Sequence, residues 1–186
     1  MNVTIEDVTL DDAPVLADLV VRNRADLEVV DPPRREVFYT ESGQRDRVER
    51  LLSSSAEGSL RFWTIRVDGR IAGDIGITGI ERGPFQSGHL GYLVDTLHRG
   101  RGVATAAVAT AVEKAFGEMR LHRLDAGVLT TNIASQRVLL KSGFELLGLA
   151  RAYLFIAGQW RDNLIYQIIG GDRPPDDPLI DSNDAR

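Results

Sequence analysis

The chain has 186 residues, enough for one domain with a buried core, and 43% of them are hydrophobic while 26% are charged. It has no apolar run of about 18 residues that could span a bilayer, and it has no cysteine for disulfides or thiolate metal sites. The net charge of -5 gives no general attraction to a nucleic-acid backbone. We therefore expect a cytoplasmic protein that contacts neither membrane nor nucleic acid directly and holds no metal.

The N-terminal part of the chain predicts a strand followed by a helix. Residues 3–10, "VTIEDVTL", alternate between apolar and polar side chains as a half-buried strand does. Residues 10–27 then show helical spacing, with Asp11 or Asp12 as a candidate N-cap. Pro14 suits the first turn of that helix, because its missing N–H would have no partner there.

A second helix and a strand meander follow. Residues 42–58 are predicted as a charged helix, and residues 61–80 as a β-hairpin. Asp68 and Gly69 lie between the two halves of that hairpin, and this pair is typical of tight turns with positive φ. Residues 88–95, "GHLGYLVD", predict one more strand.

The second half of the chain alternates between helices and strands. Val108, Val112 and Phe116 recur every fourth residue within a predicted helix over 102–116. The remaining segments are predicted in the order strand, helix, strand and strand, over 121–130, 132–143, 144–154 and 161–169. This order predicts a mixed α/β sheet with helices on its faces. We expect one domain over residues 1–170 and a disordered tail, rich in Pro and Asp, over 171–186.

The stretch "DTLHRGRGVATAAV", residues 95–108, suggests an anion site between a strand and a helix. Backbone N–H groups in such a turn are unpaired and lie at the positive end of the helix dipole. Glycine lets a ligand approach the backbone closely, and Arg99 and Arg101 could add charge-assisted bonds. The pattern favours a phosphate or a pyrophosphate.

Several interpretations of this turn remain open from the residues alone. A Walker loop needs a Lys after the glycines, and none follows. A dinucleotide fingerprint would use Gly100 and Gly102, with Asp125 near the position of a ribose-binding acid, but Thr105 replaces the third glycine. The remaining interpretations are a loop for the pyrophosphate of an acyl-CoA and a plain Gly-rich turn with solvated arginines.

These residues resemble the GNAT superfamily of acyl-CoA-dependent N-acetyltransferases. The family loop, [QR]-x-x-G-x-[GA], is matched by Arg99, Gly102 and Ala104. The likeness continues through "LGYLVDTLHRGRGVATAAV", "TNIASQRVLLKSGFE" and "RAYLFIAGQWRDNLIY", in the order and spacing of the RimJ/RimL-like branch, and "RNRADLEVVDPPR" is also similar to it. It implies a GNAT-like fold, with a mixed and mostly antiparallel sheet that is splayed at the CoA-binding strand.

The resemblance also implies where acetyl-CoA binds. Leu93 and Val94 match the backbone that pairs with the pantetheine arm, and Asn132 matches an Asn that bonds the same arm. From its own position Asn132 is also a candidate N-cap. Lys141, near the end of the same helix, is a candidate contact to a CoA phosphate, although a solvated Lys is the plainer interpretation. The loop amides that would hold the pyrophosphate belong to Arg99, Gly100, Arg101, Gly102, Val103, Ala104 and Thr105.

The implied reaction is attack of a neutral amine on the acetyl thioester, followed by departure of the CoA thiolate. Ser135 matches a hydroxyl placed near the sulfur, and it is the candidate proton donor, unless it is only a first-turn serine. Many members use a tyrosine later in this helix, where this chain has Leu139 and Leu140. The family's acids are also missing, because Gly88 and Leu154 stand at those positions.

Without an obvious base, the acceptor's own pKa becomes important. Glu81, Asp74 and Glu41 remain as bases that would act through water. About a tenth of an α-amine with a pKa near 7.7–8.0 is already neutral at pH 7, whereas a lysine near 10.4 would need about 3.5 kcal/mol of help. This difference favours an α-amine as the acceptor.

The function expected from the sequence is therefore transfer of acetyl from acetyl-CoA to a primary amine, most simply the N-terminal α-amine of a protein of the ribosomal type. Asn23, Arg34 and Tyr39 are the candidate contacts to that acceptor, unless they serve only in capping, solvation or packing. The alternatives are acetylation of a small amine, such as an antibiotic or an aminoacyl metabolite, and a non-catalytic acyl-CoA-binding module. We expect a monomer or a homodimer.

Overall fold

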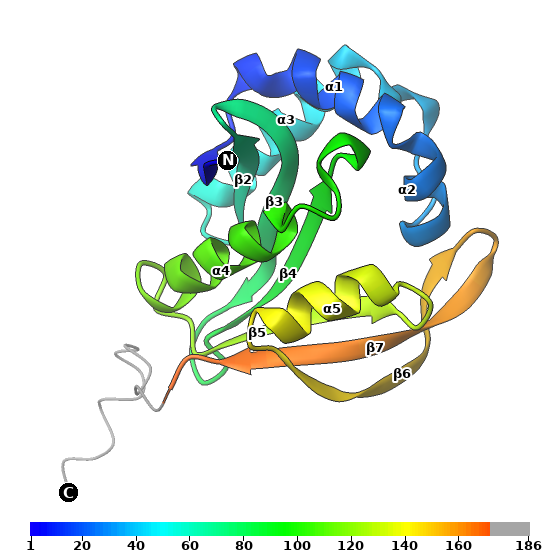
Figure 1. The fold of residues 1–186 in the computed structure, drawn as a ribbon. Helices are drawn as coiled ribbons and strands as arrows, with labels where there is room; N and C mark the ends of the chain where they lie inside the picture. Colours follow the sequence, from blue (N-terminus) through cyan, green and yellow to red (C-terminus); the bar gives the residue numbers. More distant parts are fainter. Residues whose placement is uncertain (172–186) are drawn as a thin grey trace, which may run out of the picture.

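Seven strands of the described chain form one sheet, and helices cover it on both sides (Figure 1). The computed structural model describes residues 1–171. The strand order is β1-β2-β3-β4-β5-β7-β6, and every neighbouring pair is antiparallel except β4 and β5. The strands are β1 (Val3–Asp7), β2 (Arg61–Val67), β3 (Arg70–Glu81), β4 (Ser87–Val94), β5 (Arg123–Leu129), β6 (Glu145–Ile156) and β7 (Gln159–Ile169). The predicted mixed α/β class is confirmed.

The helices agree with the prediction except at the N-terminus. They are α1 (Ala13–Arg22), α2 (Arg24–Val30), α3 (Glu41–Ala56), α4 (Val103–Phe116) and α5 (Ile133–Lys141). The single helix predicted over 10–27 is wrong, because α1 ends and α2 begins at Asn23. Nδ2 of Asn23 donates a hydrogen bond of 2.8 Å to the carbonyl of Leu19. An asparagine that bonds its own backbone in this way competes with regular helix geometry.

Three further features concern the parts of the chain outside these helices. Short 3₁₀ turns cover Leu10–Asp12, Glu36–Tyr39 and Thr96–His98. The tight hairpin turn is confirmed, with φ of 49° at Asp68 and 81° at Gly69. Apart from Gly171, the tail predicted as disordered lies outside the described residues.

No helix within residues 1–171 is long and apolar enough to cross a membrane.

The main hydrophobic core lies between the sheet and one pair of helices, α4 and α5 (Figure 1). Alternate residues of the central strands point toward these helices, as the pleat requires. On the opposite side, α1 and α3 cover β1 to β4 with two smaller clusters. The large side chains of the main core that are completely buried are Ile65, Ile75, Ile77, Leu124 and Leu139.

The sheet splits between β4 and β5. The parallel pairing joins Ser87 to Arg123 and ends where His89 lies opposite Asp125. The other edge of β4 stays paired with β3 as far as Val94. From Leu90 onward, β4 therefore has no strand on the side of β5, and the two strands diverge (Figure 1).

A buried carboxylate ties the end of β4 to the end of α1. Asp95 is 2% exposed, and Arg22 donates to its Oδ2 from Nη2 at 2.6 Å and from Nε at 3.0 Å. Asn23 Nδ2 and the Leu97 N–H donate to Oδ1, both at 3.2 Å. Burial opposes ionisation of Asp95, but these hydrogen bonds, led by that of Arg22, lower its pKa to about 2.

Because of this carboxylate, we expect the stability of the protein to depend on pH. The pKa of this carboxylate is lower in the folded protein than in the unfolded chain. It therefore stabilises the folded protein at pH values above the unfolded-state pKa, and this contribution is lost as the pH falls to the folded-state pKa. We expect Asp95→Asn to lower the free energy of unfolding at pH 7 by about 2–3 kcal/mol. The loss measured by urea denaturation should shrink between about pH 4 and pH 2.

The matched control is Asp46→Asn, which removes an exposed carboxylate from α3. Its free energy of unfolding should follow that of the wild type within about 0.5 kcal/mol across the same pH range. Equal losses in the two variants would show that Asp95 makes no special contribution.

Candidate functional site

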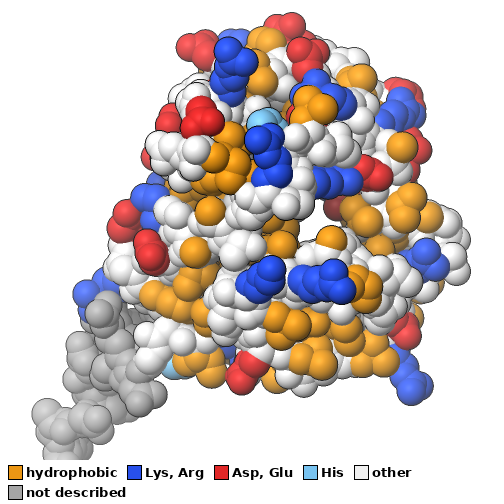
Figure 2. Space-filling model, in the orientation of Figure 1, with side chains coloured by type: hydrophobic (Ala, Val, Ile, Leu, Met, Phe, Trp, Pro, Cys, Tyr) orange, Lys and Arg blue, Asp and Glu red, His pale blue; other side chains and the backbone are white. Residues whose placement is uncertain are grey.

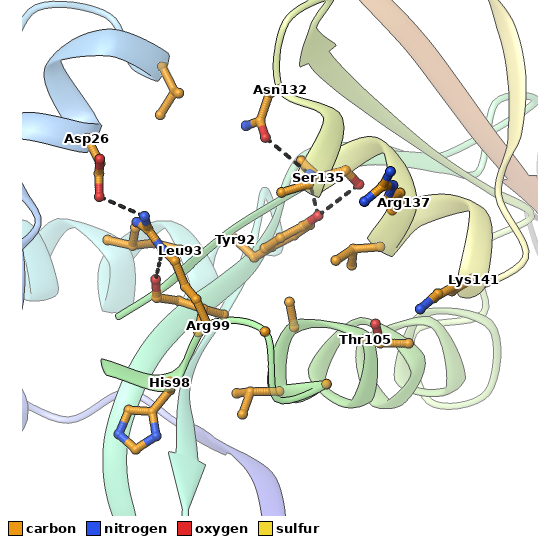
Figure 3. A pocket seen from close by; sticks show the side chains of 18 of the residues that line it. Asp26, Tyr92, Leu93, His98, Arg99, Thr105, Asn132, Ser135, Arg137 and Lys141 are labelled. Carbon is orange, nitrogen blue, oxygen red and sulfur yellow. Dashed lines mark hydrogen bonds and ion pairs between the residues drawn. The ribbon is translucent and has the colours of Figure 1, made fainter. Parts of the chain in front are cut away.

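The split in the sheet opens a cavity of about 550 Å³. Its walls come from α2, the end of β4, the loop that leads into α4, and α5 (Figure 3). Most of the residues predicted to bind the cofactor contribute to the walls of this cavity, and so does Ser135. They come together although they lie up to 48 positions apart in the sequence. The predicted residues on its walls are Leu93, Val94, Arg99, Gly100, Gly102, Val103, Ala104, Thr105, Asn132, Ser135 and Lys141.

Backbone N–H groups at the start of α4 face a ligand site with no side chain to cap them. Gly102 is the N-cap residue, with φ of 81°, a conformation that only glycine adopts freely. The N–H groups of Val103, Ala104 and Thr105 belong to the first turn, where a helix has no carbonyl partners of its own. This end of the cavity can therefore bind an anion.

Cationic side chains lie around the same cavity. Arg137 and Lys141 are four residues apart on α5, and both line its wall (Figure 3). Neither forms an ion pair with any residue that the structure describes. Lys and Arg side chains also gather around the hollow in this face of the molecule (Figure 2). Together with the loop amides, these two side chains suit a ligand with several phosphates.

The two arginines of the loop differ in their positions. Arg99 lines the cavity, where Nη1 contacts Oδ2 of Asp26 at 2.6 Å and Nε donates to the carbonyl of Val94 at 3.4 Å. Arg101 is exposed and does not line the cavity. Arg99 thus connects the loop to α2, while Arg101 does not take part in the cavity wall.

Two hydroxyl groups meet where β4 leaves β5. Tyr92 Oη lies 2.8 Å from Ser135 Oγ, and both residues line the cavity (Figure 3). Burial raises the pKa of Tyr92 to about 12, although the hydrogen bond with Ser135 opposes the shift. The phenol is therefore protonated throughout the neutral range. Asn132 accepts a hydrogen bond from the Ser135 N–H at 3.1 Å, which confirms the predicted N-cap.

Tyr92 was not singled out from the sequence. The pleat could have found it, because Leu90, Tyr92 and Val94 alternate toward α4 and α5. That argument needs the side of the sheet on which α5 lies, and only the fold supplies it. His98 was also missed as a lining residue.

The residues predicted to contact the acceptor do not line this cavity. Asn23 is 1% exposed, and its Oδ1 accepts a hydrogen bond from the Thr96 N–H. Tyr39 is buried, and Arg34 is paired with Asp31. The same segment of the chain contributes other side chains to the wall, which are Asp26, Val29 and Val30 of α2.

The acids considered as bases are also outside the cavity wall. Asp74 is buried in an ion pair with Arg47 at 3.0 Å, and neither Glu41 nor Glu81 lines the wall. Among the described lining residues, Asp26 is the one carboxylate, and it is paired with Arg99. Residues 1–171 contain no group of three or more His, Cys, Asp or Glu that could hold a metal ion.

Comparison with known proteins agrees with this geometry. Residues 2–145 match the acetyltransferase (GNAT) domain. The chain is 34% identical over 174 residues to "Probable N-acetyltransferase YjcK" of Bacillus subtilis (strain 168), covering 92% of this chain and 96% of that protein. It is 30% identical over 166 residues to the "[Ribosomal protein uS5]-alanine N-acetyltransferase" of Escherichia coli (strain K12), covering 88% of this chain and 86% of the relative.

Solved structures show the same fold. The ribosomal-protein-S5-alanine acetyltransferase from Vibrio fischeri has a TM-score of 0.89 and 29% identity, with 94% of this chain and 97% of that chain covered. Mycobacterium smegmatis RimJ, solved in complex with CoA-disulfide, has a TM-score of 0.87 and 29% identity, with 90% and 81% covered. The chain therefore belongs to the GNAT family of acetyltransferases, on its RimJ/RimL-like side, and is an N-acetyltransferase that uses acetyl-CoA.

Proposed function

We propose that this enzyme acetylates the N-terminal α-amine of a protein, and that the cavity between β4 and β5 binds its acetyl-CoA. One observation supports an α-amine as the acceptor. Asp26 is the one carboxylate among the described lining residues, and it is paired with Arg99 at 2.6 Å. No other carboxylate of the described residues lines the wall, so the site suits an amine that is partly neutral without help. The similarity to a uS5-alanine N-acetyltransferase supports the same class.

The walls of the cavity fit the chemical parts of acetyl-CoA. The uncapped amides of Val103 to Thr105 suit a pyrophosphate, and Arg137 and Lys141 suit further phosphate charge. The edge of β4 that faces β5 is unpaired beyond His89, and its backbone groups, close to the lining residues Leu93 and Val94, can bond the amides of the pantetheine arm. The volume of about 550 Å³ is typical of a ligand site. Bound acetyl-CoA would supply the acetyl group as a reactive thioester.

The paired hydroxyls would manage the leaving group. As the amine nitrogen bonds to the acetyl carbon, the carbon–sulfur bond breaks and the sulfur takes up a proton. In this proposal Ser135 Oγ–H donates that proton, Tyr92 Oη–H, 2.8 Å away, replaces it, and solvent returns a proton to Tyr92 before the next turnover. A phenol is protonated at neutral pH, and burial raises the pKa of Tyr92 further, so both hydroxyls carry their protons there. The proton lost by the amine passes to water.

The acceptor class can be tested with peptides. A peptide that begins with alanine and carries an internal lysine should be acetylated at its N-terminus, because about a tenth of that amine is neutral at pH 7. The same peptide with a blocked N-terminus should not react at lysine. Mass spectrometry of the fragments locates the acetyl group. Acetylation of small amines without peptide acetylation would rule out the proposed acceptor.

The proton donor can be tested by removing each hydroxyl. We expect Ser135→Ala to lower kcat about 100-fold and Tyr92→Phe about 10-fold, because each removes a step of proton supply to the sulfur. Calorimetry should show acetyl-CoA affinity within about twofold of wild type in both variants, since neither hydroxyl is assigned to ground-state binding.

Ser142→Ala is the control for this pair. Ser142 lies at the end of α5 outside the cavity, where its hydroxyl donates to the Val138 carbonyl at 2.9 Å. Its kcat should match that of the wild type. A kcat for Ser135→Ala equal to that of this control would exclude the serine as the donor.

The phosphate end can be tested by charge removal. The double variant Arg137→Ala with Lys141→Ala should weaken acetyl-CoA binding about tenfold at low salt, because it removes from the wall two cations that no described carboxylate neutralises. The difference from wild type should shrink at high ionic strength. The control is Arg50→Ala, which removes an exposed cation from α3. Equal affinity in the double variant and the control would place the phosphates elsewhere.

A further inference from the structure

One glycine of the central strand β4 is exposed. Gly91 lies in the fourth of the seven strands, where neighbouring strands and packed helices normally bury a residue, yet solvent reaches it. A Cβ placed on Gly91 would have no described atom within 4 Å apart from the adjoining residues of the chain. Gly91 therefore faces an open space that is accessible from solvent.

Packing does not explain why residue 91 is a glycine. Gly76 of β3 pairs with Gly91, and a Cβ at Gly76 would lie 2.5 Å from the ring of Phe62. A Cβ at Gly88 would lie 2.5 Å from Ile77. Gly91 has no such close neighbour among the described atoms, and its φ is not in the left-handed region. A glycine inside a strand often marks a place where a ligand approaches the backbone closely.

Gly91 faces away from the side of the sheet that carries the paired hydroxyls. Leu90 and Tyr92, on either side of it, point toward α4 and α5 in the main core. Side chains alternate along a strand, so position 91 points to the opposite side. Leu93 points the same way and packs against the smaller hydrophobic cluster of α1 and α2. The helices that cover this side therefore reach Leu93 and leave Gly91 open.

The cavity joins the two sides of the sheet next to Gly91. Tyr92 lines it on the side of α5, whereas Leu93 and Val29 of α2 line it on the other side. The passage exists because β4 has no strand beside it on the side of β5 after His89. A group that enters the open space at Gly91 is thus one residue along the strand from Tyr92.

We propose that Gly91 determines the access of the acceptor. The space left by its missing side chain holds the N-terminal residue of the acceptor, and the amine reaches the thioester through the split between β4 and β5. Acetyl-CoA stays on the side of α4 and α5. A side chain at position 91 would obstruct the acceptor and leave the donor's wall intact, because Gly91 does not line the cavity. The inference rests on the proposed function for its substrate, the α-amine.

The variant Gly91→Val separates acceptor binding from folding. Valine favours strands and its Cβ has room, so the thermal midpoint should stay unchanged or rise. We expect KM for an alanine-initiated peptide to rise about tenfold, because the added atoms occupy the acceptor's space. The Kd for acetyl-CoA, measured by calorimetry, should stay within about twofold of wild type. Gly91→Ala adds one methyl group and should raise KM by a smaller factor.

Gly148→Val is the matched control. Gly148 lies in β6 outside the cavity wall, its φ is not in the left-handed region, and a Cβ there would also have no described atom within 4 Å. Its acceptor KM should equal that of the wild type.

Three results would overturn the proposal. The first is an unchanged acceptor KM in Gly91→Val, or in Gly91→Ala if the valine variant does not fold. The second is an equal rise in KM in Gly148→Val. The third is a loss of acetyl-CoA affinity as large as the rise in acceptor KM, because the open space would then belong to the donor.

The acceptors are an alanine-initiated peptide and alanine amide, assayed in parallel. If the wild type acetylates only alanine amide, the proposed protein acceptor fails. The KM ratio on alanine amide still decides the role of Gly91, so the two failures are distinguishable.

Discussion

The separation of β4 from β5 is the constraint on which the site depends. A central strand normally has both edges paired, yet β4 loses its second partner after His89. Backbone N–H and C=O groups are obligatory hydrogen-bonding groups, so the edge of β4 that β5 leaves unpaired beyond His89 needs water or a ligand. The split also lets a cavity pass between the strands.

A second, electrostatic constraint holds the edges of this opening in place. Asp95 follows directly after β4 and is bonded by Arg22 and Asn23 from the junction of α1 and α2. The helix break at Asn23 therefore has a structural role, because α2, which begins after it, contributes to the cavity wall. Arg99 and Asp26 add a second connection between the loop and α2. The loop that leads into α4 is thus connected to the α1–α2 junction at Asp95 and to α2 at Arg99.

Sequence alone determined the features whose signals are local. The hairpin turn at Asp68 and Gly69, the N-cap at Asn132 and the Gly-rich entry to α4 each depend on a few neighbouring residues, and all three are present. Backbone conformation and capping depend on contacts within one turn, so no tertiary information is needed. The sequence did not predict the helix break at Asn23, because the Asn23 side chain also accepts a hydrogen bond from the N–H of Thr96, which is 73 positions away.

Only the tertiary structure decided which distant side chains meet. Tyr92 reaches Ser135 across 43 positions because the pleat of β4 and the placement of α5 bring the hydroxyls together. The sequence pointed to Arg34 and missed Asp26, because local pattern shows which residues share a helix but not which face meets a cavity. Which side chains face the cavity depends on helix packing and strand register, and these are determined by contacts throughout the chain.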